Sequence, residues 1–131
     1  MKALIITDGT DVIHSIASLI KDNLSGFNTI VLSADKFDGT ELLAADFFFI
    51  GCENPSPSSF NFLEEMLSHI NLASRKCAVF SVKTKTIKYL RGIIKPSEAG
   101  AAEPFVSESF FDFNNKANET EITKWLKSIN I

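Results

Sequence analysis

The sequence predicts an α/β fold in three layers (αβα), with a five-stranded parallel sheet between two layers of helices. Short apolar runs alternate along the chain with segments whose apolar residues recur at helical spacing. In addition, residues 46–52 (DFFFIGC) are almost entirely apolar, as expected of a central strand that is covered on both faces. The resulting order βαβαβαβαβα requires right-handed crossovers and favours the strand order 2-1-3-4-5.

Five segments are predicted as strands because each is short and rich in β-branched or aromatic residues. They are residues 2–6 (KALII), 29–33 (TIVLS), 46–52 (DFFFIGC), 76–82 (KCAVFSV) and 104–113 (PFVSESFFDF). The last segment alternates apolar and polar residues in part, which favours a position at the edge of the sheet.

Five further segments are predicted as helices from their 3.6-residue apolar spacing. They are residues 13–24, 40–44, 59–71, 86–94 and 118–129. We expect Asp11 to cap the first helix, Ser59 to cap the third, and Asn118 to begin a capping box that Glu121 completes. Pro96 ends the fourth helix, since proline cannot continue it.

Composition limits the classes of function. A length of 131 residues predicts a single domain, residues 1–131, and a net charge of −3 argues against nucleic acid as the main partner. No apolar run approaches the roughly 20 residues that cross a bilayer, and no secretion signal is recognisable, so we expect no membrane partner and a cytoplasmic location. Cys52 and Cys77 fall at opposite ends of neighbouring strands, too far apart for a disulfide, and no cysteine or histidine cluster predicts a metal site.

The fold rule places a ligand crevice at the carboxyl ends of the strands, where the strand order reverses. The loops that reach it are residues 7–13 (TDGTDVI), 52–59 (CENPSPSS) and 82–86 (VKTKT). A helix start offers unpaired N–H groups to an anion. The first loop, however, carries two aspartates and one glycine, and its carboxylates oppose an anion.

Residues 2–20, 45–67 and 93–110 resemble the flavodoxin-like family, over most of the chain. The resemblance implies a site for flavin mononucleotide (FMN), whose phosphate the family holds in a loop reading Ser/Thr-x-Thr-Gly-x-Thr. Laid on this chain, the motif covers residues 8–13, and only Thr10 matches. Asp8 replaces a hydroxyl donor, Asp11 replaces the glycine, and Ile13 replaces the last hydroxyl. A carboxylate about 5 Å from the phosphate costs on the order of 3 kcal/mol at an effective dielectric near 20.

The other two loops also depart from the family pattern. Residues 53–59 contain no aromatic to stack on the flavin, and residues 82–86 contain neither glycine nor aromatic. The candidate cofactor-binding residues are Asp8, Gly9, Thr10, Asp11, Val12 and Ile13 in the first loop, Cys52, Glu53, Asn54, Pro55 and Ser56 in the second, and Lys83, Thr84 and Lys85 in the third.

Several interpretations of these residues stay open at this level. Asp8 and Asp11 are typical of a metal or phosphoacceptor site, or of a capped helix start with Asp8 in solvent. Lys83, Lys85 and Lys88 form either an anion-binding patch or a solvated face. Cys52 is either a reactive thiol or a small buried apolar residue.

Three functions follow. The first is a non-enzymatic domain with a weakened or lost FMN site that binds a protein partner or another ligand. The second is an FMN electron carrier with atypical loops. The third is a pseudo-receiver signalling domain, although Gly51-Cys52 stands where a receiver carries its aspartate. No set of residues predicts a catalytic nucleophile or a hydrolase.

Overall fold

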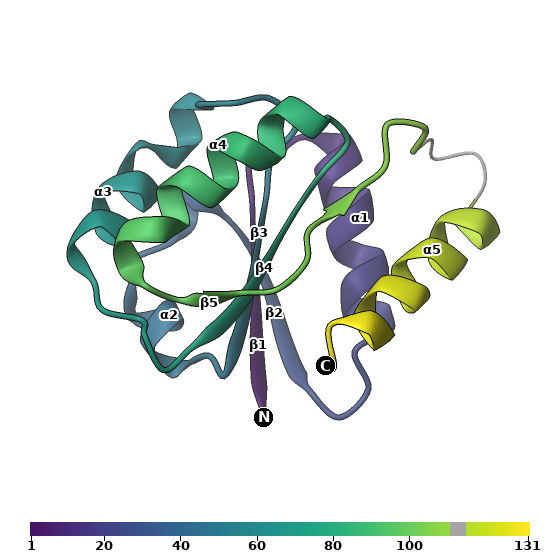
Figure 1. The fold of residues 1–131 in the computed structure, drawn as a ribbon, viewed down its shortest axis with the longest axis horizontal. Coiled ribbons are helices and arrows are strands. Elements are labelled where there is room, and N and C mark those ends of the chain that lie inside the picture. The colour runs from purple at the N-terminus through teal and green to yellow at the C-terminus, as the bar shows by residue number, and fades with distance from the viewer. Residues whose placement is uncertain (111–114) are drawn as a thin grey trace.

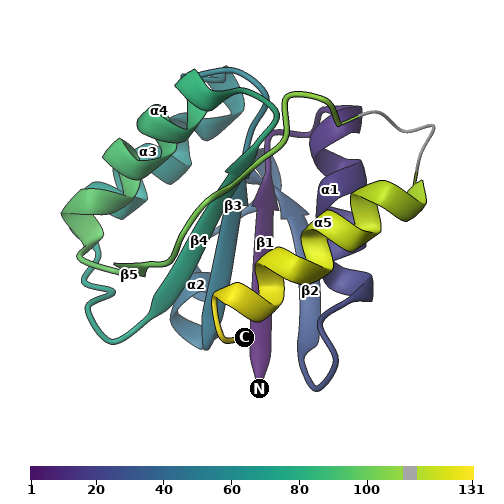
Figure 2. The same ribbon diagram turned by 45° about the vertical axis from the view of Figure 1, so that its right-hand side comes forward.

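The computed structural model describes residues 1–110 and 115–131, and places a twisted sheet between two helical layers (Figures 1 and 2). The strands are β1 (Lys2–Thr7), β2 (Asn28–Ser33), β3 (Phe47–Gly51), β4 (Lys76–Ser81), β5 (Gly100–Ala101) and β6 (Phe105–Val106). The helices are α1 (Asp11–Asp22), α2 (Thr40–Ala44), α3 (Asn61–His69), α4 (Thr84–Ile94) and α5 (Asn115–Ser128). Short 3-10 turns lie at Ala34–Lys36, Ser58–Phe60 and Lys95–Ser97. No helix within these ranges is long and apolar enough to span a bilayer.

The predicted fold class and strand order are confirmed. The sheet runs β2-β1-β3-β4-β5, and every recorded pairing is parallel. In Figure 2, α3 and α4 cover one face of the sheet while α1 and α5 cover the other. The fifth position in the sheet is filled by two short strands, because β6 also pairs with β4.

The edge beside β4 is interrupted where we predicted one continuous strand over residues 104–113. β5 pairs Gly100 with Lys76, whereas β6 pairs Phe105 with Phe80, so the register advances by one residue between them. The extra residue and Pro104, which has no N–H to donate, explain the break. The predicted bounds are therefore wrong: within them only Phe105–Val106 pairs with β4, and residues 111–113 lie outside the described residues.

The side chains of β3 alternate between two apolar cores. Phe48 and Ile50 pack toward α3 and α4, in the first core. Phe47 and Phe49 pack toward α1 and α5, where the Phe49 ring meets that of Trp125 with centroids 5.7 Å apart. Because all five residues of β3 are buried, the central strand is held on both faces, as its apolar run predicts.

Three predicted helix starts are wrong. Thr10 is the N-cap residue of α1, and Asp11 is its first helical residue. Ser59 lies in the 3-10 turn before α3, whose N-cap residue is Phe60. Asn118 is a buried residue within α5, which begins earlier at Asn115. Asp11 and Ser59 each lie one residue from the N-cap position that the backbone adopts, whereas α5 begins three residues before Asn118.

Gly51 ends β3 under the aromatic ring of Phe80, its partner on β4. A Cβ atom built at Gly51 would lie 2.3 Å from the Phe80 ring. Real Cβ atoms do not approach so closely, so the ring of Phe80 could stay in place only if the backbone moved. Glycine at this position is therefore a packing requirement of the central strands.

We expect Gly51→Ala to lower the free energy of unfolding by about 1–3 kcal/mol, the typical cost of overpacking a core. Urea denaturation at equilibrium measures it. Gly92→Ala is the matched control: a Cβ at Gly92 meets nothing within 4 Å, so this change should stabilise α4 by about 0.5–1 kcal/mol. Equal stability of Gly51→Ala and the wild type would contradict the packing argument.

Candidate functional site

The loops after β1, β3 and β4 meet at one edge of the sheet, where the strand order reverses. Since the three strands are parallel neighbours, their carboxyl ends lie together, at the upper side of the sheet in Figure 1. This is the place where open α/β sheets bind ligands.

Asp8 joins the first loop to the second. Its Oδ1 accepts hydrogen bonds from the Thr10 backbone N–H at 3.0 Å and from the Thr10 hydroxyl at 2.7 Å. Its Oδ2 accepts from the backbone N–H of Glu53 at 2.8 Å. We call this arrangement the Asp8 bridge. Asp8 is half-buried, so the expectation that it stands in solvent is wrong.

Two buried hydroxyls fix the second loop from the side of β4. Ser81 Oγ donates to the Cys52 carbonyl at 2.7 Å, and Thr86 Oγ1 donates to the Glu53 carbonyl at 2.9 Å. Both side chains are fully buried. The peptide groups of Glu53 are thus held on both sides, its N–H by Asp8 and its carbonyl by Thr86.

The third loop is tied in the same way. Lys83 Nζ donates to Asn54 Oδ1. The Thr84 N–H and hydroxyl both donate to Glu108 Oε1, at 3.2 and 3.1 Å. The polar groups at the mouth of the crevice therefore bind one another across the loops.

The predicted site residues do not line one cavity. Gly9 and Asp11 line a hollow of about 400 Å³ beside β2. Pro55, Ser56 and Lys85 line a separate, open hollow of about 580 Å³ between α3 and α4.

Two other predicted residues offer no side chain to a ligand. Ile13 is fully buried in the core under α1, and Cys52 in the opposite core. Val12 is half-buried and packs against the same core as Ile13.

Three residues that the sequence did not single out also organise the crevice: Ser81, Thr86 and Glu108. Ser81 is the last residue of β4 and Thr86 lies in the first turn of α4, so both stand at the carboxyl end of that strand. This placement was a usable signal for Ser81 and Thr86. Nothing local marks Glu108, because its partner Thr84 lies 24 residues earlier.

Neither cysteine has the character of a reactive thiol. Burial raises the pKa of Cys52 well above the ordinary thiol value, and the charges of Asp8 and Glu64 raise it further. Burial alone raises the pKa of Cys77 to about 12. Both thiols are free, as expected from their positions in the sheet. Within the described ranges no group of three histidine, cysteine or acidic side chains could hold a metal ion.

The chain has a flavodoxin-like fold. The flavodoxin of Streptococcus pneumoniae TIGR4 aligns with 98% of this chain and 97% of its own at a TM-score of 0.77 and 13% identity. Oxidised flavodoxin 2 from Bacillus cereus covers the same shares at a TM-score of 0.77 and 18% identity. A flavodoxin-like domain from Synechococcus sp. aligns with 97% of this chain and 99% of its own, at a TM-score of 0.62 and 12% identity.

No model of a known protein family matches the sequence, and no curated protein matches it. At these identities the solved structures establish the fold.

The buried thiols predict a pH dependence of stability. Above about pH 8.5, the ordinary thiol pKa, the unfolded chain releases thiol protons that the folded chain keeps. The unfolded state then binds fewer protons, so the free energy of unfolding should fall as pH rises, by up to about 1.4 kcal/mol per pH unit for each thiol. Urea denaturation from pH 7 to 10 measures the slope. Cys52→Ala with Cys77→Ala should flatten it, and an unchanged slope would contradict the assignment.

Proposed function

We propose that this chain is a flavodoxin-like domain with a weakened FMN site, and that it acts as a non-enzymatic module through a binding partner. The observation that carries the proposal is the Asp8 bridge. Its carboxylate occupies two backbone N–H groups of the crevice, those of Thr10 and Glu53, so that an internal anion stands where a bound anion would need donors.

The charges at the crevice support the same conclusion. A flavin phosphate bound in the first loop would lie close to Asp8 and Asp11. Each carboxylate at about 5 Å costs on the order of 3 kcal/mol, whereas the dipole of α1 returns about 0.3–1 kcal/mol. Both residues therefore fit a dianionic phosphate poorly.

The loops that would enclose a flavin ring fit it poorly as well. Residues 53–59 and 82–86 offer no aromatic for stacking. The hydroxyls of Ser81 and Thr86 are already bonded to carbonyls of the second loop, and Lys83 to Asn54. A ring entering between these loops would have to displace bonds that hold them together.

One observation favours the second candidate, an FMN electron carrier with atypical loops. The first N–H of α1 with an acceptor is that of His14, which donates to the Thr10 carbonyl at 2.9 Å. The N–H groups of Asp11, Val12 and Ile13 precede it, and helix geometry leaves such groups without an internal partner. These three donors could hold a phosphate through the backbone alone.

FMN titration distinguishes the two candidates. We expect the purified protein to be colourless and to bind added FMN weakly in calorimetry. Asp8→Ser with Asp11→Gly should tighten FMN binding at least tenfold, because the change removes two negative charges and releases the N–H groups of Thr10 and Glu53. The double variant should lose about 2–4 kcal/mol of stability, chiefly through the hydrogen bonds that Asp8 accepts, with smaller losses from the dipole interaction and the added glycine.

Asp22→Ser is the matched control, since it removes a carboxylate from the far end of α1 and should leave FMN binding unchanged. A yellow protein, or sub-micromolar binding of FMN by the wild type, would overturn the proposal in favour of the electron carrier. If the double variant folds and its affinity for FMN does not rise, the carboxylates of Asp8 and Asp11 are not what weakens the site.

A further inference from the structure

The cations of this acidic protein are concentrated on one helix. Residues 83–95 hold five of the 13 lysine and arginine residues and none of the 16 acidic ones. We call these five the basic stripe: Lys83, Lys85, Lys88, Arg91 and Lys95. The rest of the chain therefore carries the other eight cations and all 16 carboxylates, so the stripe is a local reversal of a negative background.

The stripe faces solvent and is not neutralised. Lys85, Lys88, Arg91 and Lys95 are all exposed along α4 and the turn after it. Among the described residues, no carboxylate forms an ion pair with any member of the stripe, and only Lys83 makes a side-chain hydrogen bond, to the neutral Asn54. At about 1.5 Å per residue, the charges from Lys85 to Lys95 extend over about 15 Å.

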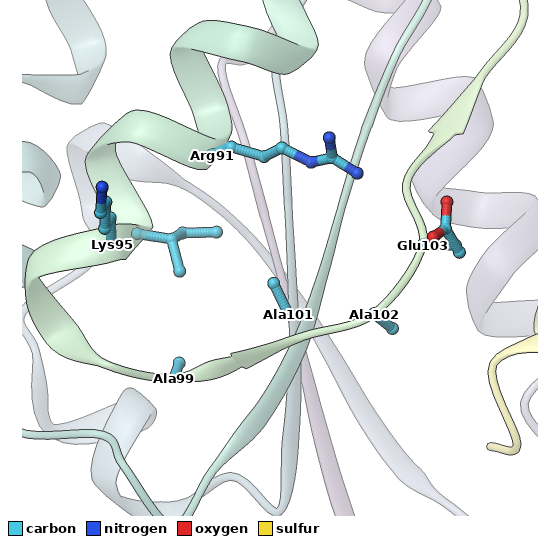
Figure 3. A pocket seen from close by; sticks show the side chains of 7 residues that line it. Arg91, Lys95, Ala99, Ala101, Ala102 and Glu103 are labelled. Carbon is cyan, nitrogen blue, oxygen red and sulfur yellow. The ribbon is translucent and has the colours of Figure 1, made fainter.

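A hollow adjoins the stripe on each side. Lys85 and Lys88 border the hollow between α3 and α4, whose wall includes Tyr89. Arg91 and Lys95 border a second hollow of about 370 Å³, whose floor includes Ala101. Figure 3 shows the Arg91 side chain reaching from α4 over this second hollow, above the β5 segment. The cations thus border two hollows whose linings combine apolar and charged residues, with Glu64 in the first and Glu103 in the second.

Gly92 lies on the same exposed face, between Lys88 and Lys95 in helical spacing. A glycine inside a helix costs about 0.5–1 kcal/mol relative to alanine. Nothing lies within 4 Å of a Cβ built there, so packing within the chain does not require glycine. Because Gly92 has no side chain, the backbone of a bound partner can approach the middle of the stripe on α4 closely.

We propose that the basic stripe is a docking surface for an acidic protein segment, such as a helix that presents a row of glutamate or aspartate side chains. The inference rests on the proposed function and names the class of its partner. Carboxylates of the segment pair with the unneutralised cations, and its backbone lies over Gly92. Such complementary charge steers association and fixes the orientation of the partner.

The size and surroundings of the stripe favour a protein segment over other polyanions. Glu64 and Glu103 each line one of the two hollows beside the stripe, and Glu98 follows Lys95 by three residues. A polyanion wider or longer than the stripe, such as a long nucleic acid or an anionic membrane, would meet these carboxylates. The exposed stripe also lacks an aromatic platform, since Tyr89 is half-buried, and single-stranded nucleic acids need such a platform for stacking. A short acidic segment can instead stay within the stripe.

The test uses a fluorescein-labelled 20-residue peptide of alanine and glutamate with glutamates at helical spacing, followed by fluorescence anisotropy at 20 mM salt. We expect saturable binding of this peptide. Lys88→Glu with Arg91→Glu should weaken binding at least tenfold. Lys21→Glu with Lys124→Glu, which changes the net charge equally on the opposite layer, should alter it less than twofold. Arg91 and Lys21 occupy the last turns of their helices, so the pairs are matched in dipole effect.

Gly92→Gln provides a second test that leaves the charge unchanged. It should weaken peptide binding severalfold while making the protein no less stable to urea. Equal weakening by both charge-reversal pairs would overturn the proposal, since net charge alone would then explain binding. It would also be overturned if a single-stranded oligonucleotide or phosphatidylserine vesicles displaced the peptide at equal concentration of negative charge. The FMN titrations test the proposed function independently of peptide binding, so a failure of the proposed function can be distinguished from a failure of this proposal.

Discussion

The burial of both faces of β3 is the constraint on which the rest of the structure depends. Its side chains pack alternately into two cores, so that helices must cover the sheet on both sides. The helical crossovers that provide this cover place the strands beside β3 parallel to it. The same constraint fixes where the chain emerges. Gly51 lies under the ring of Phe80, and the next residue, Cys52, is still fully buried. Glu53 is therefore the first residue of the second loop that reaches the crevice, and it does so directly opposite Asp8.

The crevice that follows is held together by the groups that would otherwise receive a ligand. The carboxylate of Asp8, the hydroxyls of Ser81 and Thr86 and the carboxylate of Glu108 each bond the backbone of another loop. These hydrogen bonds lower the affinity of the crevice for a ligand, because a ligand would have to compete with bonds already made among part-buried groups. The fold thus keeps the geometry of a binding edge, while the exposed cations of α4 form no ion pair within residues 1–110 and 115–131.

The sequence predicted the fold well because its strongest signals come from burial. The apolar run of residues 46–52 and the helical spacing of Ile13, Ile16 and Ile20 both reflect packing, which also determines the fold. The helix starts were predicted poorly. Residues such as Asp11, Ser59 and Asn118 are favourable at the N-cap and also in the first turn of a helix, so their presence does not fix the residue at which the helix begins. The individual long-range hydrogen bonds could not be predicted: the fold rule brings the loops of Asp8 and Glu53 to one crevice, but it does not pair the carboxylate of Asp8 with the N–H of Glu53, 45 residues later. The interrupted fifth strand was missed for the same reason, since its register is set by β4.

The two edges of the sheet differ in their capacity to accept another strand. Beside β4, the inserted residue and Pro104 break the edge into two short pieces, so a further strand would find no continuous row of donors and acceptors. At the opposite edge, β2 runs unbroken from Asn28 to Ser33, contains no charged residue or proline, and exposes 48% of Ile30. Intermolecular β-pairing is therefore favoured at β2 and disfavoured beside β4. Ile30→Lys would place a charge on the β2 edge and oppose such pairing.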